Sequence, residues 1–586
     1  MSAAAPRNLT VYSFSFRGDL LFNAISRTVA EGSTRSQHPC YDATVPDECR
    51  EYRCIGVPGA GKTTWLSRQA RKAAAKYGKD RVVICSLTRA AAAEVGGRDT
   101  GIPPEHVATL HALCYRALGR PDIVEGKHVK EWNELHPGMA LNGDASGDVD
   151  DSKGGDYGGT LIEQSDLLRA RRTPRERWPK HLLVFDDAWK KFKEERSLCD
   201  FTDLIERGLR ELPYAPGNPN VILGDECQDW SRLEIDLVRK WSRETDHLVL
   251  CGDPLQALFA FRGSDPNILS LDGIPDSHIR VPREEDDIGE RGRGWRASPQ
   301  KSYRVPAELK TLARKVVSGL PGSEVDFIST EVEGSVHRAG FSFRAPERLG
   351  DVLPKLDGSV MILASCEHML RPTEAWLRKE GVPYHNPYAK RWNPLRSTWK
   401  KLAGYIAPSA REGLPYERLS LDEVKAWAEL LRAQDVFVRG GKTRILNASA
   451  EEPLPRLLPE CFTEDAFDKL WDGDLEWFLA HADPSKGVAY PGAVLKRIGA
   501  ESMMLAMSLP PKDRPFVTLG TMHSVKGGEA DHVLVYPDIA RASWEEAQRP
   551  GWSGVEATRR LFYVAITRAK KSLWIGQPDG KHFVRL

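Results

Sequence analysis

The segment from Gly56 to Thr63 has the sequence GVPGAGKT, which matches the phosphate-loop pattern G-x-x-x-x-G-K-[ST]. Glycines let the backbone turn tightly, so that its N–H groups point at a polyphosphate. Lys62 is expected to reach the terminal phosphates, and the hydroxyl of Thr63 to hold a magnesium ion. The segment predicts a nucleoside triphosphate site made of Gly56, Gly59, Ala60, Gly61, Lys62, Thr63 and Thr64.

The sequence on either side of this segment favours a true phosphate loop over a chance match. The apolar pair Cys54-Ile55 precedes it, as expected of a strand, and a helical pattern runs from Thr64 to about Tyr77. A helix that begins at the loop points its positive dipole end at the phosphates. We therefore expect a strand, a phosphate loop and a helix in that order.

Two carboxylates, Asp225 and Glu226, end the apolar run that begins at Asn220. Asp225 is expected to hold magnesium, directly or through water, and Glu226 to orient and deprotonate the attacking water. An isolated Asp-Glu pair is more often a helix cap or a surface turn. The phosphate loop in the same chain favours the catalytic interpretation.

The elements that position these residues follow an α/β pattern. Strands are expected at 81–87, 107–111, 220–226 and 247–253, each ending in polar or charged residues, and ligands gather at the carboxyl ends of parallel strands. A second α/β region starts near 298, with strands at 359–364, 516–519, 532–536 and 572–575. The pattern stops between 115 and 197 and between 396 and 511. The sequence predicts two α/β lobes, each interrupted by an insertion.

Composition limits the other classes of protein. A chain of 586 residues with 41% hydrophobic and 28% charged residues is typical of a soluble globular protein with roughly three or four domains. The net charge of +1 means that a nucleic acid would need a local positive track. No signal peptide or long apolar run is evident, which predicts a cytoplasmic protein without a membrane segment. The ten cysteines are scattered, and Cys85, Cys227 and Cys251 are expected to be buried thiols; three more, Cys40, Cys49 and Cys54, lack a C-x-x-C pair.

Further motifs resemble, in order, those of the UvrD/Rep-type helicases of superfamily one. The resemblance begins with the phosphate loop and with Asp225-Glu226-Cys227-Gln228-Asp229. It continues through the segments 87–94, 109–111, 252–263, 302–304, 374–384, 521–529 and 556–569. It implies two RecA-like P-loop domains with parallel sheets, each carrying an inserted mainly helical accessory domain. The expected boundaries are 1–114 with 198–297 for the first lobe, 115–197 for its insertion, 298–395 with 512–586 for the second lobe, and 396–511 for its insertion.

On the nucleotide side, the resemblance implies a role for each matching residue. Gln256 would sense the terminal phosphate, Tyr303 would stack on adenine, and Glu529 would contact the ribose. Arg304 and Arg568, both from the second lobe, would stabilise charge on the transferred phosphate. With the residues identified above, the expected catalytic set is Lys62, Glu226, Gln256, Arg304 and Arg568.

On the DNA side, the resemblance implies a track for one strand. Phe259 and Phe261 would stack on bases, a contact that tolerates any sequence. The backbone or neighbouring bases would be touched by Thr88, Arg89, His111, Arg262, His523 and Ser524. The implied activity is that of an ATP-dependent DNA helicase that uses ATP and Mg²⁺, moves 3′-to-5′ on single-stranded DNA and acts at single/double-strand junctions.

Other interpretations stay open. One alternative is a single-stranded DNA translocase, or a motor subunit without autonomous unwinding, and another is a regulatory nucleotide switch that binds DNA. Two basic and aromatic stretches, 169–180 and 388–401, are either DNA contacts or solvated helix faces. The chain also departs from the family: Gln37 lacks the surroundings of an adenine-binding glutamine motif, Gly528 replaces a Leu or Phe, and the insertion at 396–511 is short.

Overall fold

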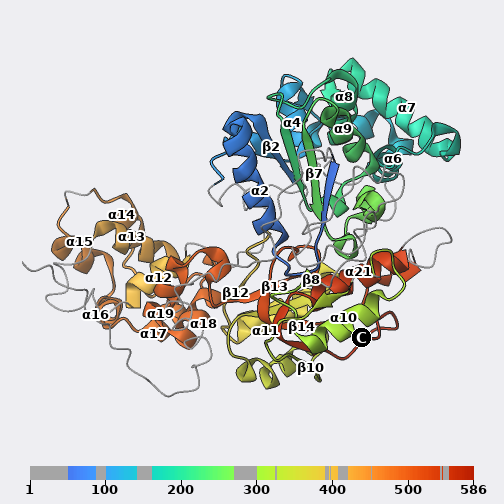
Figure 1. The fold of residues 1–586 in the computed structure, drawn as a ribbon. Coiled ribbons are helices and arrows are strands. Elements are labelled where there is room, and N and C mark those ends of the chain that lie inside the picture. The colour runs from blue at the N-terminus through green and yellow to red at the C-terminus, as the bar shows by residue number, and fades with distance from the viewer. Residues whose placement is uncertain are drawn as a thin grey trace, which may run out of the picture. The chain divides into compact units, whose positions relative to one another are not determined.

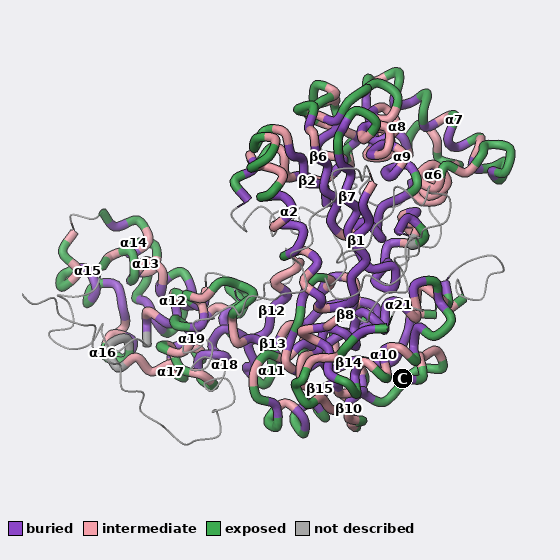
Figure 2. Tube along the Cα trace, viewed as in Figure 1, coloured by how far each residue is buried: buried purple, intermediate pink, exposed green. Residues whose placement is uncertain are grey.

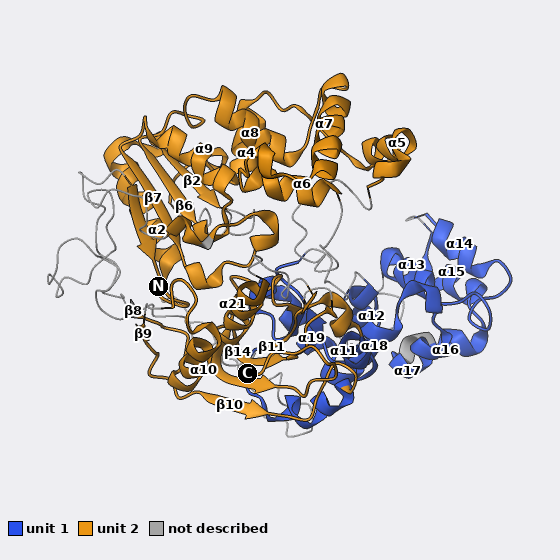
Figure 3. Ribbon diagram, turned by 90° about the vertical axis from the view of Figure 1, so that its right-hand side faces the viewer, with its two compact units in different colours: residues 1–34, 346–360, 372–519 blue, residues 35–345, 361–371, 520–586 orange. Residues whose placement is uncertain are grey.

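A computed structural model describes the chain over residues 51–86, 100–141, 161–269, 300–323, 326–389, 395, 398–406, 420–449, 452–541, 544–545 and 554–586. The described residues fall into two compact units (Figure 3). Unit 1 comprises 346–360 and 372–519, and unit 2 comprises 51–345, 361–371 and 520–586, apart from the gaps. Five residues named above, Gln37, Cys40, Cys49, Thr88 and Arg89, lie outside the described ranges, as do residues 390–394 of the stretch 388–401.

The first sheet of unit 2 has five parallel strands in the order β1-β7-β6-β2-β3. They are β1 (Glu51–Ile55), β2 (Val82–Ser86), β3 (Val107–Ala108), β6 (Val221–Asp225) and β7 (His247–Gly252). The order is not sequential, so β2 lies beside β6 and β1 beside β7 (Figure 1). The carboxyl ends of these parallel strands share one edge of the sheet. At this edge the phosphate loop follows β1, and Asp225 is the last residue of β6.

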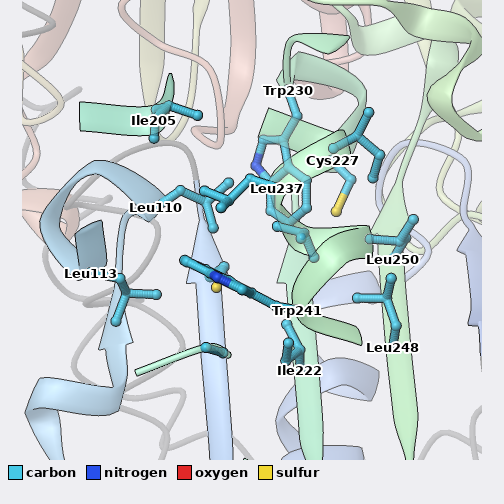
Figure 4. Close-up of a cluster of buried hydrophobic side chains, with 14 of the residues drawn as sticks. Leu110, Leu113, Ile205, Ile222, Cys227, Trp230, Leu237, Trp241, Leu248 and Leu250 are labelled. Carbon is cyan, nitrogen blue, oxygen red and sulfur yellow. The ribbon is translucent and has the colours of Figure 1, made fainter. Parts of the chain in front are cut away.

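Side chains alternate along the strands and pack against helices on both faces of this sheet. On one face, Val82 and Ile84 belong to a core with α2 (Lys62–Tyr77). On the other face, the core contains α4 (Leu110–Ala117), α8 (Phe201–Glu211) and α9 (Arg232–Ser242). Figure 4 shows Ile222, Leu248 and Leu250 of the sheet gathered near Leu237 and Trp241 of α9. Burial on both faces explains why these strands are continuous apolar runs.

The strand expected at 107–111 is shorter than predicted. It ends at Ala108, and Thr109 caps the N-terminus of α4 by accepting a hydrogen bond from the N–H of Ala112 at 3.2 Å. Threonine has high β propensity, but its hydroxyl also satisfies a free helix N–H group. His111 consequently lies in the first turn of a helix and not at a strand end.

The second sheet of unit 2 contains neighbouring strands in the order β10-β15-β14-β11. These are β10 (Ser335–Arg338), β11 (Val360–Ala364), β14 (Ala530–Val535) and β15 (Ala569–Ile575). Strand β15 is parallel to β10 and to β14. Two helices, α10 (Ala307–Val317) and α21 (Gly554–Ile566), pack against each other beside it, and a short parallel pair joins β8 (Gln300–Lys301) to β9 (Phe327–Ile328).

Unit 1 is mainly helical. Among its described residues, β12 (Tyr384–His385) pairs in parallel with β13 (Val517–Thr521). The helices bury one apolar side each (Figure 2). They are the end of α11 (Glu367–Lys379), α12 (Thr398–Ile406), α13 (Leu421–Leu430), α14 (Gly441–Asn447), α15 (Leu454–Cys461), α16 (Glu464–Asp472), α17 (Leu475–His481), α18 (Ala489–Ile498) and α19 (Ala500–Ser508).

A second helical region interrupts the first sheet. It contains β4 (Asp122–Ile123), α5 (Gly126–Leu135), α6 (Leu161–Ala170), α7 (Lys180–Glu195) and β5 (Leu198–Cys199). An aromatic core holds α5 and α7 together, made of Trp132, Phe185, Trp189 and Phe192. Parallel sheets interrupted by helical regions confirm the predicted α/β fold class.

Two buried cations tie α6 to α7 and α8. The guanidinium of Arg169 lies 2.5 Å from Asp203 and 2.7 Å from Glu206, and it also pairs with Asp166 and Asp200. Lys193 of α7 pairs with Asp200 and Asp203 as well. The side chains of Arg169 and Lys193 are 8% and 4% exposed, so water screens these pairs little.

Replacing Arg169 with methionine should lower the free energy of unfolding by about 3–5 kcal/mol, because it leaves buried carboxylates without their main counter-charge. Urea denaturation measures the change. The control is Arg177→Met at an exposed position of the same region, where a change within about 0.5 kcal/mol is expected. A loss below about 1 kcal/mol for Arg169→Met would mean that the network is solvated and not structural.

The basic stretch at 169–180 is largely paired inside the protein. Arg172 lies 2.5 Å from Asp236, and Arg175 lies 2.5 Å from both Asp186 and Asp187. Arg169 is in the buried network. These pairs favour the structural interpretation of the stretch over a DNA contact.

Two further observations concern membrane-spanning helices and cysteines. Among the described residues, no helix is both long and apolar enough to cross a membrane. Cys85, Cys227 and Cys251 are buried thiols, as predicted, and burial raises the pKa of Cys85 and Cys227. Cys40 and Cys49 lie outside the described residues.

Candidate active site

The phosphate loop connects β1 to α2, as the sequence predicts. Gly61 adopts the left-handed conformation, with φ 83°, immediately before the first residue of α2. Lys62 folds back along the loop, and its Nζ donates hydrogen bonds to the carbonyls of Gly56 at 2.9 Å and Val57 at 3.3 Å. The first turn of α2 contains no acidic residue, so its N–H groups face the loop without a competing anion.

Gly59 meets a distant segment of the chain. Its φ is 73°, and a Cβ there would lie 2.5 Å from the Cβ of Arg304. The carbonyl of Gly59 accepts a hydrogen bond from the N–H of Tyr303 at 3.0 Å, and Ser302 Oγ donates to the carbonyl of Pro58 at 2.6 Å. Glycine is required here both by conformation and by close approach.

Thr63 and Asp225 lie together at the edge of the first sheet. Thr63 Oγ1 donates to Asp225 Oδ2 at 3.2 Å. Burial, and next the charge of Glu226, raise the pKa of Asp225. A hydroxyl and a carboxylate are oxygen ligands of the kind that Mg²⁺ prefers, and a bound cation favours the ionised carboxylate.

Glu226 is held in a left-handed conformation, with φ 56°, which is uncommon for a residue with a side chain. Its Oε2 accepts a hydrogen bond from Gln228 Nε2 at 2.6 Å and lies 3.0 Å from Lys526 Nζ. Burial alone would raise the pKa of Glu226, but the ammonium groups of Lys526 and Lys62 outweigh it and lower the pKa to about 2. The carboxylate is therefore ionised and oriented, so it can accept a hydrogen bond from a water molecule.

Arg568 connects the second sheet to the first. It follows α21, and its Nη2 donates to Gln256 Oε1 at 2.7 Å, while Gln256 Nε2 donates to Asp253 Oδ2 at 2.6 Å. Two backbone carbonyls, of Val564 and Gly528, fix the rest of the guanidinium. Burial, and next the charge of Arg304, lower the pKa of Arg568, yet a guanidinium stays charged at neutral pH.

The second predicted arginine lies beside the predicted ribose contact. Arg304 Nε is 2.8 Å from Glu529 Oε2, and Lys570 Nζ is 2.6 Å from Glu529 Oε1. Burial would raise the pKa of Glu529, but Arg304 and Lys570 lower it to about 2. Tyr303 is half-buried next to them, with Lys301 Nζ 5.7 Å from its ring centroid.

The candidate stacking residues form a cluster with His523. The ring centroids of Phe259 and Phe261 are 5.9 Å apart, and that of Phe261 is 6.1 Å from His523. Phe259 is only 3% exposed, whereas Phe261 is half-buried. Phe261 therefore presents more ring surface to a base than Phe259 does.

The remaining candidate DNA residues are mostly uncharged where they lie. Burial lowers the pKa of His523 to about 4, and burial also lowers the pKa of His111, which lies 3.8 Å from Glu234. Both imidazoles are neutral at physiological pH. Ser524 is buried, and its hydroxyl donates to the carbonyl of Thr521 at 3.0 Å. Arg262, 6.0 Å from the Phe259 ring centroid, is the charged member among those described.

Lys526 was not singled out by sequence reasoning, although it lies inside the motif 521–529. Its Nζ pairs with Asp229 as well as Glu226, and lies 5.7 Å from the Phe259 ring centroid. Asp229 Oδ1 in turn accepts a hydrogen bond from the N–H of Leu258 at 3.0 Å. A lysine two or three residues from matched positions was a usable signal, and the same holds for Lys570 after Arg568.

Comparison with known proteins supports one family at both ends of the chain. Residues 49–262 match the AAA domain family, and residues 495–578 match the UvrD-like helicase C-terminal domain family. These ranges contain the phosphate loop, Glu226 and Gln256 in the first and Glu529 and Arg568 in the second. The chain belongs to the UvrD/Rep-type helicases of superfamily one. The proteins that are similar to this chain match it over different shares of its length.

Two relatives of this UvrD-like chain are the ATP-dependent DNA helicases UvrD1 of Mycobacterium tuberculosis and of Mycobacterium bovis. Each is 22% identical over 644 aligned positions, which cover 89% of this chain and 80% of the relative. The Bacillus subtilis protein named "Putative ATP-dependent DNA helicase YjcD" is 26% identical over 240 positions, which cover 36% of this chain. The match spans 31% of that protein's length.

In this UvrD-like helicase, the structure brings most of the predicted site residues together. The phosphate loop, Asp225, Glu226 and Gln256 gather at one edge of the first sheet, and Tyr303, Arg304, Glu529 and Arg568 reach it from the second region of unit 2. The aromatic cluster adjoins it through Lys526. Thr88 and Arg89 lie outside the described residues.

Proposed function

We propose that the protein is an ATP-dependent DNA helicase that translocates 3′-to-5′ on single-stranded DNA and separates duplex strands at junctions. The observation that carries the proposal is the contact between Arg568 and Gln256 at 2.7 Å. It joins a guanidinium on one α/β region to the short turn after β7 on the other, beside the phosphate loop. A nucleotide there would be held by both regions, so hydrolysis would change how they meet.

The residues present fit ATP and Mg²⁺. The loop N–H groups and Lys62 would hold the phosphates, and the oxygens of Thr63 and Asp225 would hold the ion, which neutralises phosphate charge when bound. Glu226 would orient and deprotonate the attacking water. Arg568 and Arg304 would stabilise the charge that develops on the transferred phosphate. Tyr303 and Glu529 would bind the nucleoside.

A single strand would run along the aromatic cluster. Phe261 supplies a stacking surface that tolerates any base, worth about 1–3 kcal/mol per base. Lys526 lies between this cluster and the catalytic carboxylate, since it pairs with Glu226 and approaches the ring of Phe259. A base that displaces Phe259 would therefore move Lys526, and with it the ion pair to Glu226. This supports hydrolysis that is coupled to DNA binding.

Tailed duplexes test the proposal. With ATP and Mg²⁺, the protein should displace the strand of a duplex that carries a 3′ single-stranded tail and leave 5′-tailed and blunt duplexes paired. Each base-pair step costs about 1.4 kcal/mol of stacking, a modest load for one triphosphate. Displacement from the 5′ tail would overturn the direction, and ATP hydrolysis with DNA but no displacement from either tail would indicate a translocase.

A further inference from the structure

The C-terminal end of helix α6 contacts the turn that carries the candidate stacking residues. This turn, residues 259–265, contains the short helix η8 (Ala260–Arg262), and we call it the η8 turn. Arg171 Nη2 donates a hydrogen bond to the carbonyl of Ala260 at 3.3 Å. A Cβ on Gly263 would lie 2.8 Å from the Cβ of Ala170, so the two backbones meet as closely as glycine allows. The helical insertion and the η8 turn therefore form one packed contact.

Arg171 acts on both ends of this turn. Its guanidinium bonds the carbonyl of Ala260 at one end, and it lies in the field of Asp265 at the other. Burial lowers the pKa of Arg171, and Asp265 opposes that effect. Asp265 is itself fixed, since its N–H donates to the carbonyl of Trp230 at 3.1 Å. The side chain thus bonds one end of the turn and is attracted by the charge of the carboxylate at its other end.

Helix α6 is a rigid support for Arg171. The buried network of Arg169 holds the last turn of the helix to α8, whereas the pair between Arg172 and Asp236 on α9 is solvent-exposed and adds little. The last turn of α6 is therefore anchored by Arg169 independently of the η8 turn. A movement of the turn would have to break the contact at Ala260 rather than drag the helix with it.

We propose that Arg171 is a positioning residue that fixes the η8 turn, and with it Phe259 and Phe261, for binding of single-stranded DNA. The helical insertion then contributes to DNA affinity without touching the strand. This inference rests on the proposed function, because the turn matters only if DNA binds there.

The salt dependence of binding separates positioning from direct contact. A cation that binds a backbone phosphate releases a counterion, so removing it lowers the slope of log affinity against log salt by about 0.7 for a single strand. A positioning residue changes affinity at every salt concentration and leaves the slope unchanged. Arg171 is directed at Ala260 and Asp265, so we expect the second behaviour.

The test compares Arg171→Met with Arg172→Met, two variants that remove the same charge from adjacent positions. The readout is K½, the concentration of oligothymidylate that gives half-maximal stimulation of ATP hydrolysis, measured at several salt concentrations. Arg171→Met should raise K½ about 3- to 10-fold, the worth of one intramolecular hydrogen bond, with the wild-type slope. Arg172→Met should match the wild type, and Arg171→Lys should fall between, since its ammonium still donates.

Three results would overturn the inference: equal shifts for Arg171→Met and Arg172→Met, no shift for Arg171→Met, or a slope reduced by about 0.7. Thermal denaturation of each variant shows whether it is folded. If Arg171→Met is not folded, the K½ of Arg171→Lys is compared with that of the wild type instead. Wild-type protein whose hydrolysis ignores DNA would instead contradict the proposed function, so the two failures are distinguishable.

Discussion

Replacing Arg568 with alanine is expected to lower the kcat of DNA-stimulated ATP hydrolysis by about 10³ or more. The guanidinium is fixed by Gln256 and by two backbone carbonyls, so it enters the reaction already oriented. The loss corresponds to about 4 kcal/mol of barrier, because each tenfold change in rate is about 1.4 kcal/mol. Steady-state phosphate release with saturating single-stranded DNA measures it.

The control for Arg568 separates the loss of a charge from the loss of geometry. Arg568→Lys keeps the charge but lacks the planar fork that bonds Gln256, Val564 and Gly528, so it should recover only a small part of the rate. Arg541→Ala removes a charge from an exposed position that pairs with Glu545, and should leave kcat unchanged. A fall of less than tenfold for Arg568→Ala would remove this residue from the catalytic set.

Replacing Glu226 with glutamine is expected to lower the same kcat by about 10²–10⁴, the range for a general base. Glutamine keeps the volume and the hydrogen bond with Gln228 but cannot take up a proton. Because the phosphate loop is untouched, the affinity for ATP should change little. The split between kcat and nucleotide affinity is the measurement.

Glu244→Gln, which removes a carboxylate from an exposed position after α9, is the matched control and should behave as wild type. If Glu226→Gln weakened ATP binding and left kcat intact, the carboxylate would have a structural role through Lys526 instead. Equal losses in both variants would point to an effect of net charge.

The strands and the phosphate loop were predictable from the sequence because their signals are local. Apolar runs ending in Asp225 and Asp253 mark fully buried parallel strands, and the structure ends β6 at Asp225 and β7 at Gly252. Thr109 was misassigned, since a threonine after two apolar residues suits a strand until its hydroxyl caps a helix.

The contacts that complete the site could not come from spacing. Lys526 and Asp229 are separated by 297 residues, and Arg568 and Gln256 by 312. Only the resemblance to a family placed Arg568 beside the nucleotide. Lys526 was missed because its pairing with Glu226 and Asp229 depends on the tertiary fold and not on sequence spacing. The burial of Phe259 could not be predicted from the sequence either, because a ring that stacks on a base and a ring in a core have the same sequence signal.

ATP hydrolysis measured with and without single-stranded DNA tests the central claim most directly: one site, built by two α/β regions, responds to DNA. We predict stimulation of at least about tenfold by oligothymidylate, in the direction expected when a partner completes a catalytic site. Lys62→Ala should remove activity in both conditions. Wild-type hydrolysis that is equally fast with and without DNA would contradict the account.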